Sequence, residues 1–137
     1  MIPGLLVVRV GAPLYFANVQ WVEDKLNAFA KRAAKYSREA GTELRYIIFD
    51  LSPVNHVDTQ GVTLLEELAE QFGARGIQLV LTNPAPRVVR TWEDAGLFNK
   101  LSRRWVFARV HDAVTTCRGL LAEADVQKAE AGDSVKL

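Results

Sequence analysis

The chain has only one cysteine, Cys117, among its 137 residues. It therefore cannot form a disulfide within itself, and a reducing compartment suits it best. An excess of charge is also missing, because 17 Lys and Arg residues balance 16 Asp and Glu residues. This balance excludes the strongly basic surface that a nucleic-acid backbone requires. No apolar run approaches the roughly 18 to 20 residues of a membrane span, since Arg9, Asn18, Glu23 and Asp50 interrupt the candidates. We predict a soluble domain with no nucleic-acid partner.

The sequence also lacks a recognisable set of catalytic, metal-binding or nucleotide-binding residues. His56 and His111 lie far apart without other ligands nearby, and a lone histidine is more often a loop or capping residue than a metal ligand. Cys117 falls among apolar residues on one helical face, which favours a small core side chain over a nucleophile. The glycines form neither a dinucleotide-binding pattern nor a P-loop. We predict no enzyme activity, no catalytic residue, no metal and no cofactor.

Hydrophobic periodicity predicts strands and helices that alternate along the chain. Short apolar or β-branched runs indicate strands, and apolar residues at helical spacing indicate amphipathic helices that end near glycines. The helix over 19–40 is predicted to bury Val22, Leu26, Phe29, Ala30 and Ala33. Strands are predicted at 5–10, 14–17, 45–51, 77–82 and 104–110, and helices at 19–40, 59–73 and 84–96, with a last helix that Asp112 caps.

This order predicts a single α/β domain. Helices between successive strands imply parallel crossovers, while the closely spaced runs at 5–10 and 14–17 predict a β-hairpin at one edge. The result is a mixed, mostly parallel sheet of about five strands with four to five helices. The almost wholly apolar run at 45–51 should be the central strand. Large hydrophobic residues stop near Ala122, so we predict a domain over 1–122 and a flexible tail over 123–137.

Five stretches of sequence carry a family resemblance. They are IPG at 2–4, APLYFAN at 12–18, LRYIIFDLSPVNHVDTQG at 44–61, LVLTNPAPRVVR at 79–90 and WVFARVHDAV at 105–114. Together they resemble the STAS domains of sulfate-permease-type (SulP) anion transporters, and those of plants, algae and cyanobacteria are the most similar in pattern. The resemblance extends over about residues 2–122 and implies the STAS fold.

The resemblance implies a regulatory and dimerisation domain at the cytoplasmic side of a membrane, placed at the C-terminus of a secondary-active transporter. The implied partners are the transmembrane domain of the same transporter, a second copy of the domain, and a kinase or cytosolic regulatory protein. Sulfate is the expected anion, with bicarbonate or another oxyanion left open. The alternative is a free-standing signalling protein similar to the anti-sigma-factor antagonists, which also have the STAS fold.

The loop at 57–61 distinguishes these two alternatives. In the antagonists, the serine just before the loop glycine is the phosphorylation switch, and here the corresponding residue before Gly61 is Gln60. Thr59, one position earlier, keeps a hydroxyl, so we predict it as a regulatory phosphosite within a regulatory loop that includes Asp58, Gln60 and Gly61. The alternative is that Asp58 or Thr59 only caps the next helix, which is worth about 1 kcal/mol.

Two other features allow more than one interpretation. Asp50 ends the central strand, as the phosphoacceptor of two-component receivers does, but the acidic pair and the lysine of a receiver are missing. We therefore predict that Asp50 bonds to its own loop. Tyr15 and Phe16 must point to opposite sides of an extended strand, so we predict an interface at Tyr15, Phe16 and Asn18, with core packing as the alternative.

Overall fold

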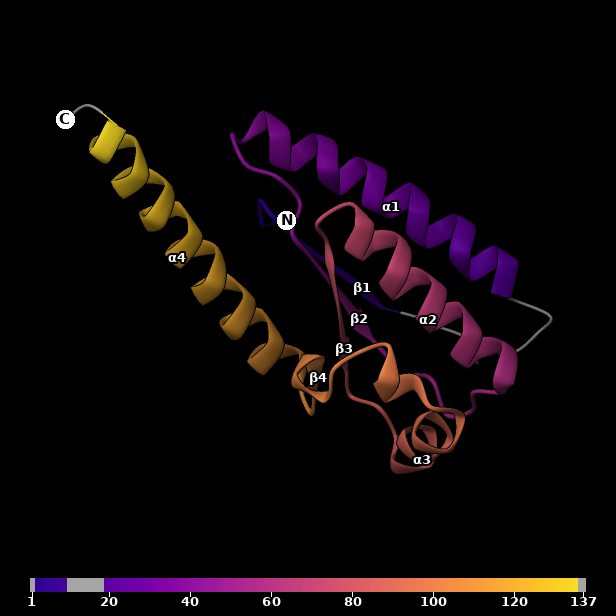
Figure 1. Ribbon diagram of the computed structural model, residues 1–137. Helices are drawn as coiled ribbons and strands as arrows, with labels where there is room; N and C mark the ends of the chain where they lie inside the picture. The colour runs from indigo at the N-terminus through magenta and orange to yellow at the C-terminus, as the bar shows by residue number, and fades with distance from the viewer. Residues whose placement is uncertain (1, 10–18, 136–137) are drawn as a thin grey trace.

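The computed structural model describes residues 2–9 and 19–135, which form an α/β domain (Figure 1). Strands and helices alternate along the chain, as the sequence predicted. The predicted strand at 14–17 lies outside the described residues, so the β-hairpin stays a prediction. The elements are β1 (Leu5–Arg9), α1 (Val19–Glu39), β2 (Tyr46–Asp50), α2 (Thr59–Ala74), β3 (Gln78–Thr82), α3 (Pro86–Ala95), the 3₁₀ helices η2 (Leu97–Asn99) and η3 (Arg103–Trp105), β4 (Val106–Phe107) and α4 (Val110–Val135).

The four described strands pair in the order β1-β2-β3-β4, and every pair is parallel. As predicted, β2 is a central strand: it lies between β1 and β3, and Ile47, Ile48 and Phe49 have no solvent exposure. β4 is shorter than the predicted strand at 104–110. The residues before it wind into η3 and α4 begins soon after it, so β4 pairs with β3 at two positions.

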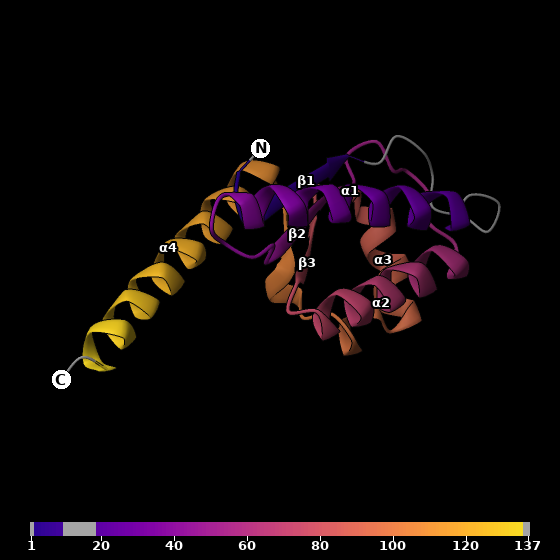
Figure 2. The same cartoon turned by 90° about the horizontal axis from the view of Figure 1, so that it is seen from above.

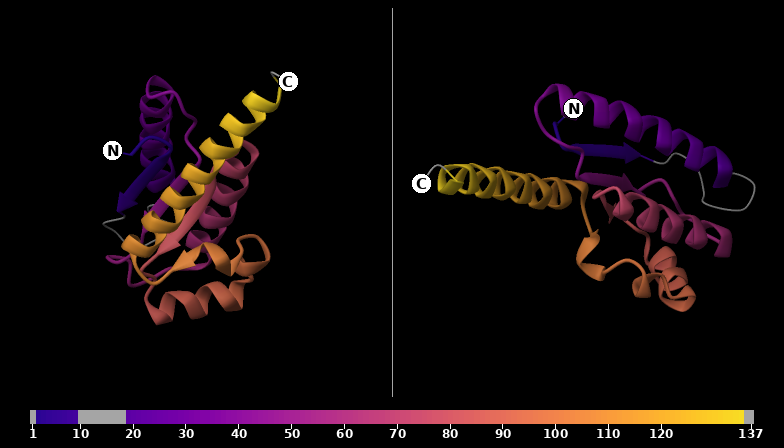
Figure 3. Two further views of the ribbon diagram at one scale, coloured as in Figure 1. Left: turned by 90° about the vertical axis from the view of Figure 1, so that its left-hand side faces the viewer. Right: turned by 45° about the horizontal axis from the view of Figure 1, so that its top comes forward.

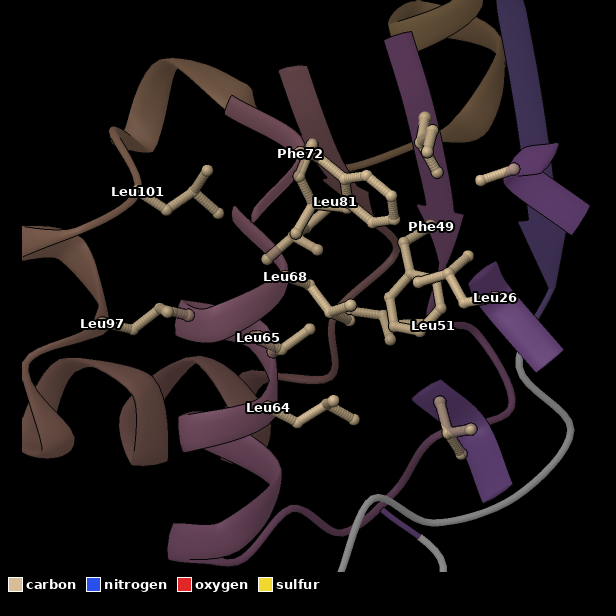
Figure 4. Packing of buried hydrophobic residues seen from close by; sticks show 14 of the residues in the cluster. Leu26, Phe49, Leu51, Leu64, Leu65, Leu68, Phe72, Leu81, Leu97 and Leu101 are labelled. Atoms are coloured by element: carbon tan, nitrogen blue, oxygen red, sulfur yellow. The ribbon is translucent and has the colours of Figure 1, made fainter. Parts of the chain in front are cut away.

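Helices cover both faces of the sheet. α1 and α2 lie side by side on one face, with α3 near the carboxyl ends of the strands, while α4 lies on the other face (Figure 1, Figure 3). The larger core lies beneath α1, α2 and α3 (Figure 4). A smaller cluster beneath α4 joins the sheet residues Leu5, Ile48 and Val80 to Ala113 and Cys117.

The buried stripe of α1 differs from the predicted one at two positions. Val22, Leu26, Ala30 and Ala33 are buried as predicted, but Phe29 is 38% exposed. The stripe passes through Ala30, and the neighbouring position 29 lies at its outer margin because successive helical residues are rotated by about 100°. The stripe ends instead at Ser37, a polar residue that is only 1% exposed.

α4 also differs from the prediction at both ends. It begins at Val110, so Asp112 lies within its first turn and is not its cap. The Asp112 carboxylate instead accepts from the Arg109 guanidinium, with an Nε to Oδ2 distance of 3.1 Å. The helix then continues to Val135, well beyond Ala122. Its second half projects from the body of the domain (Figure 2), which explains why this half needs no large hydrophobic residues. That 123–137 is flexible stays a prediction.

Candidate functional site

The loops at the carboxyl edge of the parallel sheet are tied together by Asp50. β2 ends at Asp50 and β3 ends one residue before Asn83, so the two side chains meet at this edge. Asp50 Oδ1 accepts from the Ser52 backbone N–H at 3.0 Å and from Asn83 Nδ2 at 3.3 Å. Asn83 has a left-handed backbone with φ of 55°, and its N–H donates to the Phe107 carbonyl. Asp50 therefore bonds to its own loop, as predicted.

The pKa of Asp50 reflects these contacts. Partial burial acts to raise the pKa of this carboxyl, but hydrogen bonds from Ser52 and Asn83 and the positive charge of Arg9 act in the opposite direction. The balance lowers the pKa below its usual value. Asp50 is thus an ionised acceptor that holds two loops together.

The predicted regulatory loop leads into the first turn of α2. Asp58 is the N-cap residue, and its Oδ1 accepts from the Gly61 N–H at 3.0 Å. This confirms that a residue of the pair Asp58 and Thr59 caps the helix. Thr59 and Gln60 are exposed, whereas Gly61 is buried. The hydroxyl-bearing Thr59 is thus on the surface beside the positive end of the helix dipole. Its role as a phosphosite stays a prediction, and the other predicted site, Tyr15, Phe16 and Asn18, lies outside the described residues.

Four arginines near α3 fall into two groups. Arg103 forms an ion pair with Glu93 at 3.4 Å and lies over the Phe98 ring, and Arg104 lies over the Trp105 ring. Arg87 and Arg90 are exposed and, together with Asn55, Ala85 and Pro86, line an open hollow of about 400 Å³. Arg87 and Arg90 are therefore the more available pair for an acidic partner.

The remaining reactive residue types are dispersed. His56 and His111 are exposed, while burial raises the pKa of the Cys117 thiol to about 11. Cys117 is fully buried and packs in the smaller core, as the sequence predicted. Within residues 2–9 and 19–135, no three His, Cys, Asp or Glu residues come together to hold a metal ion. No helix in these ranges is long and apolar enough to span a membrane.

Sequence reasoning missed an apolar surface along β1 and the neighbouring face of α1. Val7 is 43% exposed, Trp21 58% and Phe29 38%. The 58% exposure of Trp21 is large for a tryptophan. The sequence did contain a signal for this surface. Trp21 is next to Val22, a predicted buried position of α1, and so had to fall at the margin of the buried stripe of that helix.

The fold and the loops around Asp50 define a class of protein. It is an α/β domain whose loops are joined by hydrogen bonds at the carboxyl edge of a parallel sheet. Within this class, the sequence profile of the family described as "STAS domain" matches residues 1–113. The chain therefore belongs to the STAS domain family, which confirms the resemblance seen in the sequence.

Individual relatives point to transporters. "Probable sulfate transporter 4.2" of Arabidopsis thaliana is 36% identical over 116 residues, which cover 83% of this chain and 17% of that protein. The chain thus spans less than a fifth of the length of that relative. Among solved structures, the murine Slc26a9 anion transporter in its inward-facing state has a TM-score of 0.72 and 28% identity, covering 86% of this chain and 18% of that one. Unphosphorylated SpoIIAA, an anti-sigma factor antagonist, has a TM-score of 0.64 at 20% identity, covering 86% of this chain and 91% of that one. This last likeness concerns the fold alone.

Proposed function

We propose that this chain is the cytoplasmic regulatory and dimerisation domain of a secondary-active anion transporter, with sulfate as the expected anion. It acts through contacts with other protein surfaces, chiefly with the transmembrane domain of its own polypeptide, and performs no chemical reaction of its own. It occupies the C-terminal part of the transporter, on the cytoplasmic side of the membrane.

One observation carries this proposal: proteins named as sulfate transporters match most of this chain while the chain spans less than a fifth of their length. A match limited to so small a part of each relative is what one domain of a larger protein would give. The structure supports contact as the mode of action, because the surface combines the exposed residues Thr59 and Gln60 at the capped start of α2 with exposed apolar residues at Val7 and Trp21.

The second candidate is a free-standing partner-switching protein, and the shared fold of an anti-sigma factor antagonist favours it. The sequence of the α2 start opposes it. Where the resemblance places the phosphorylated serine of the antagonists, this chain has Gln60, which is exposed and has no hydroxyl to phosphorylate. A switch that depends on that serine does not operate here.

Sulfate uptake by cells that express the complete gene tests the proposal. Uptake should be sulfate-dependent and should fall when the segment encoding this domain is removed, while surface labelling shows that the membrane part still reaches the membrane. A gene that encodes no apolar spans, together with specific binding of this domain to a kinase, would instead establish the partner-switching candidate.

Regulation at Thr59 is a further part of the proposal. A phosphate on Thr59 adds nearly two negative charges to an exposed position at the start of α2, where the helix dipole favours them by about 0.3 to 1 kcal/mol. That charge changes which protein surfaces dock on the loop more than it changes folding. Thr59→Ala and Thr59→Asp should therefore shift uptake in opposite directions, whereas equal uptake by both variants and a bare Thr59 in phosphopeptide maps would contradict this role.

An interface at Tyr15, Phe16 and Asn18, with a second copy or with the transmembrane domain, is proposed from the sequence alone. Cysteines placed one at a time at Tyr15 or Asn18 in the complete transporter should form crosslinks to a second copy or to the transmembrane domain. A cysteine at exposed Thr116 in α4 is the matched control. Crosslinking no stronger than that of the control would remove these residues from the interface.

A further inference from the structure

The second half of α4 carries an excess of negative charge. Residues 122–135 of this helix, called here the acidic half of α4, contain four acidic residues and one lysine, Lys128. The helix dipole is negative at this end and therefore disfavours carboxylates, and the last turn has no basic residue to offset them. The charge of the acidic half is thus unfavourable in the domain alone, and it suits a cationic partner.

The rest of the described chain does not neutralise this charge. Neither of the ion pairs that join described residues lies in the acidic half. Asp125 lines an open cleft of about 530 Å³, whose other wall carries Arg38, Glu43 and Arg45. The two arginines therefore face Asp125 across the cleft without forming an ion pair with it.

The acidic half also has little apolar packing. Among the described residues, Leu121 is the last residue of α4 that packs against the smaller core. Beyond it, Glu123, Asp125 and Val126 are exposed, Val126 to 56%, and the helix projects from the body of the domain (Figure 2). A helical segment of this length is marginal in water when nothing covers it, so a bound partner would stabilise it.

The acidic half leaves the domain beside the N-terminal turn, residues 2–5, in which the Leu5 N–H donates to the Ile2 carbonyl at 3.1 Å. A Cβ placed on Gly4 of this turn would lie 3.0 Å from Leu121 Cδ2, so the turn touches α4 just before the acidic half begins. The Gly4 N–H also donates to Ser37 Oγ at 2.9 Å in a buried hydrogen bond, which fixes the turn against α1. In the proposed function a transmembrane domain precedes this turn, so the acidic half lies close to that domain.

The chemistry of a transmembrane domain at this side of the membrane complements the acidic half. Cytoplasmic loops of membrane proteins carry an excess of Lys and Arg, which supplies the cations that the acidic half lacks. The lipid headgroups of the cytoplasmic leaflet are negatively charged on average and would repel it. Charge therefore favours a protein loop over the lipid surface.

We propose that the acidic half of α4 docks on a Lys- and Arg-rich cytoplasmic loop of the transmembrane domain. The inference rests on the proposed function and names the surface and the chemistry of one of its contacts. Glu123 and Asp125 pair with the cations of the loop, and Val126 packs against their alkyl stems. Because α4 packs on the sheet through Ala113 and Cys117, a movement of the loop is passed to the sheet.

A second copy of the domain fits the acidic half less well. The exposed cations Lys31, Lys35 and Arg38 belong to α1, and α1 lies on the opposite face of the sheet from α4 (Figure 3). A pair formed by α4 of one copy and α1 of another would leave one α1 and one α4 free. Such a contact continues into an open chain of copies and does not close into a dimer.

Trypsin cleavage after Lys128 tests the proposal. Its rate is compared between the 137-residue chain and the complete transporter in a detergent without charged headgroups. Cleavage should be at least about tenfold slower in the complete transporter, and it should become faster there at about 1 M salt, where charges are screened beyond about 3 Å. Arg118 follows the buried Cys117 in the packed half of α4 and is the control site, which should be cut slowly in both proteins.

Neutral variants test the role of charge. Glu123→Gln combined with Asp125→Asn should speed cleavage after Lys128 about fivefold in the complete transporter, because two exposed ion pairs are lost. In the 137-residue chain the same pair should not speed it, since the helix dipole disfavours those carboxylates. Glu67→Gln combined with Glu70→Gln, at exposed positions of α2, is the matched control and should leave the rate unchanged.

Two results of the trypsin experiment would overturn the inference. One is equal cleavage after Lys128 in the 137-residue chain and in the complete transporter, and the other is an equal effect of the two double variants. If sulfate uptake still depends on this domain, the proposed function survives and only the docking of the acidic half is lost. A gene that encodes no membrane spans would remove both.

Crosslinking identifies the surface that the acidic half contacts. Val126→Cys in the complete transporter is treated with a thiol-to-amine reagent, and the adducts are mapped by mass spectrometry. Lysines of a cytoplasmic loop should react, whereas Thr63→Cys, at an exposed position of α2, is the control and should give far fewer adducts. Adducts with Lys31 or Lys35 of a second copy, or none above the control, would contradict the proposal.

Discussion

Replacing Ser37 with alanine should destabilise the domain, although serine is small and alanine forms helices better. Ser37 is 1% exposed, and its Oγ is the acceptor for the Gly4 N–H at 2.9 Å. Without that oxygen, a buried N–H is left unsatisfied, which costs about 1 to 3 kcal/mol. The better helix propensity of alanine returns roughly 0.5 kcal/mol. We therefore expect a net loss of about 1 to 2 kcal/mol.

Urea unfolding followed by circular dichroism measures this loss, and the slope of the free energy against urea should stay unchanged. Thr116→Ala is the matched control, because it removes a hydroxyl from an exposed helical position of α4 and should change stability by less than about 0.5 kcal/mol. The Gly4 amide should also exchange faster in Ser37→Ala than in the unchanged protein. If Ser37→Ala and Thr116→Ala had the same stability, the bond between α1 and the N-terminal turn would not be the stabilising contact described here.

Three further predictions concern named contacts. Asp58→Ala should lower the free energy of unfolding by about 0.5 to 2 kcal/mol through loss of the α2 cap, while Asp58→Asn keeps an acceptor and should cost much less; equal urea midpoints for the two variants would contradict the cap. Gly4→Ala should lower Tm, because φ is 87° and the new Cβ would lie 3.0 Å from Leu121 Cδ2, whereas Gly119→Ala meets no atom within 4 Å and should raise Tm slightly. Because the folded-state pKa of Asp50 is lowered, its carboxylate stabilises the fold above about pH 4 and loses that effect as the pH falls through the lowered pKa. The stability difference between the unchanged protein and Asp50→Asn should therefore shrink in acid, and a difference independent of pH would refute this.

Most helix and strand positions followed from local patterns. The run at 45–51 has no charged residue between Arg45 and Asp50, which indicated a strand covered on both faces, as β2 is. Asp58 and Thr59 before a helical pattern predicted that one of the two caps α2, because capping depends on a side chain and the N–H groups within the next few residues. The family resemblance came from sequence as well, since it rested on short motifs at fixed places.

The sequence by itself determined the α/β order, the central strand, the capped start of α2 and membership of the STAS family. Each of these depends on residues close together in the chain. Only the tertiary structure revealed that Ser37 binds Gly4, that Asn83 binds Asp50, and that Phe29 is partly exposed. These facts depend on which elements become neighbours in space, because a hydrogen bond across 33 residues leaves no periodic trace in the sequence.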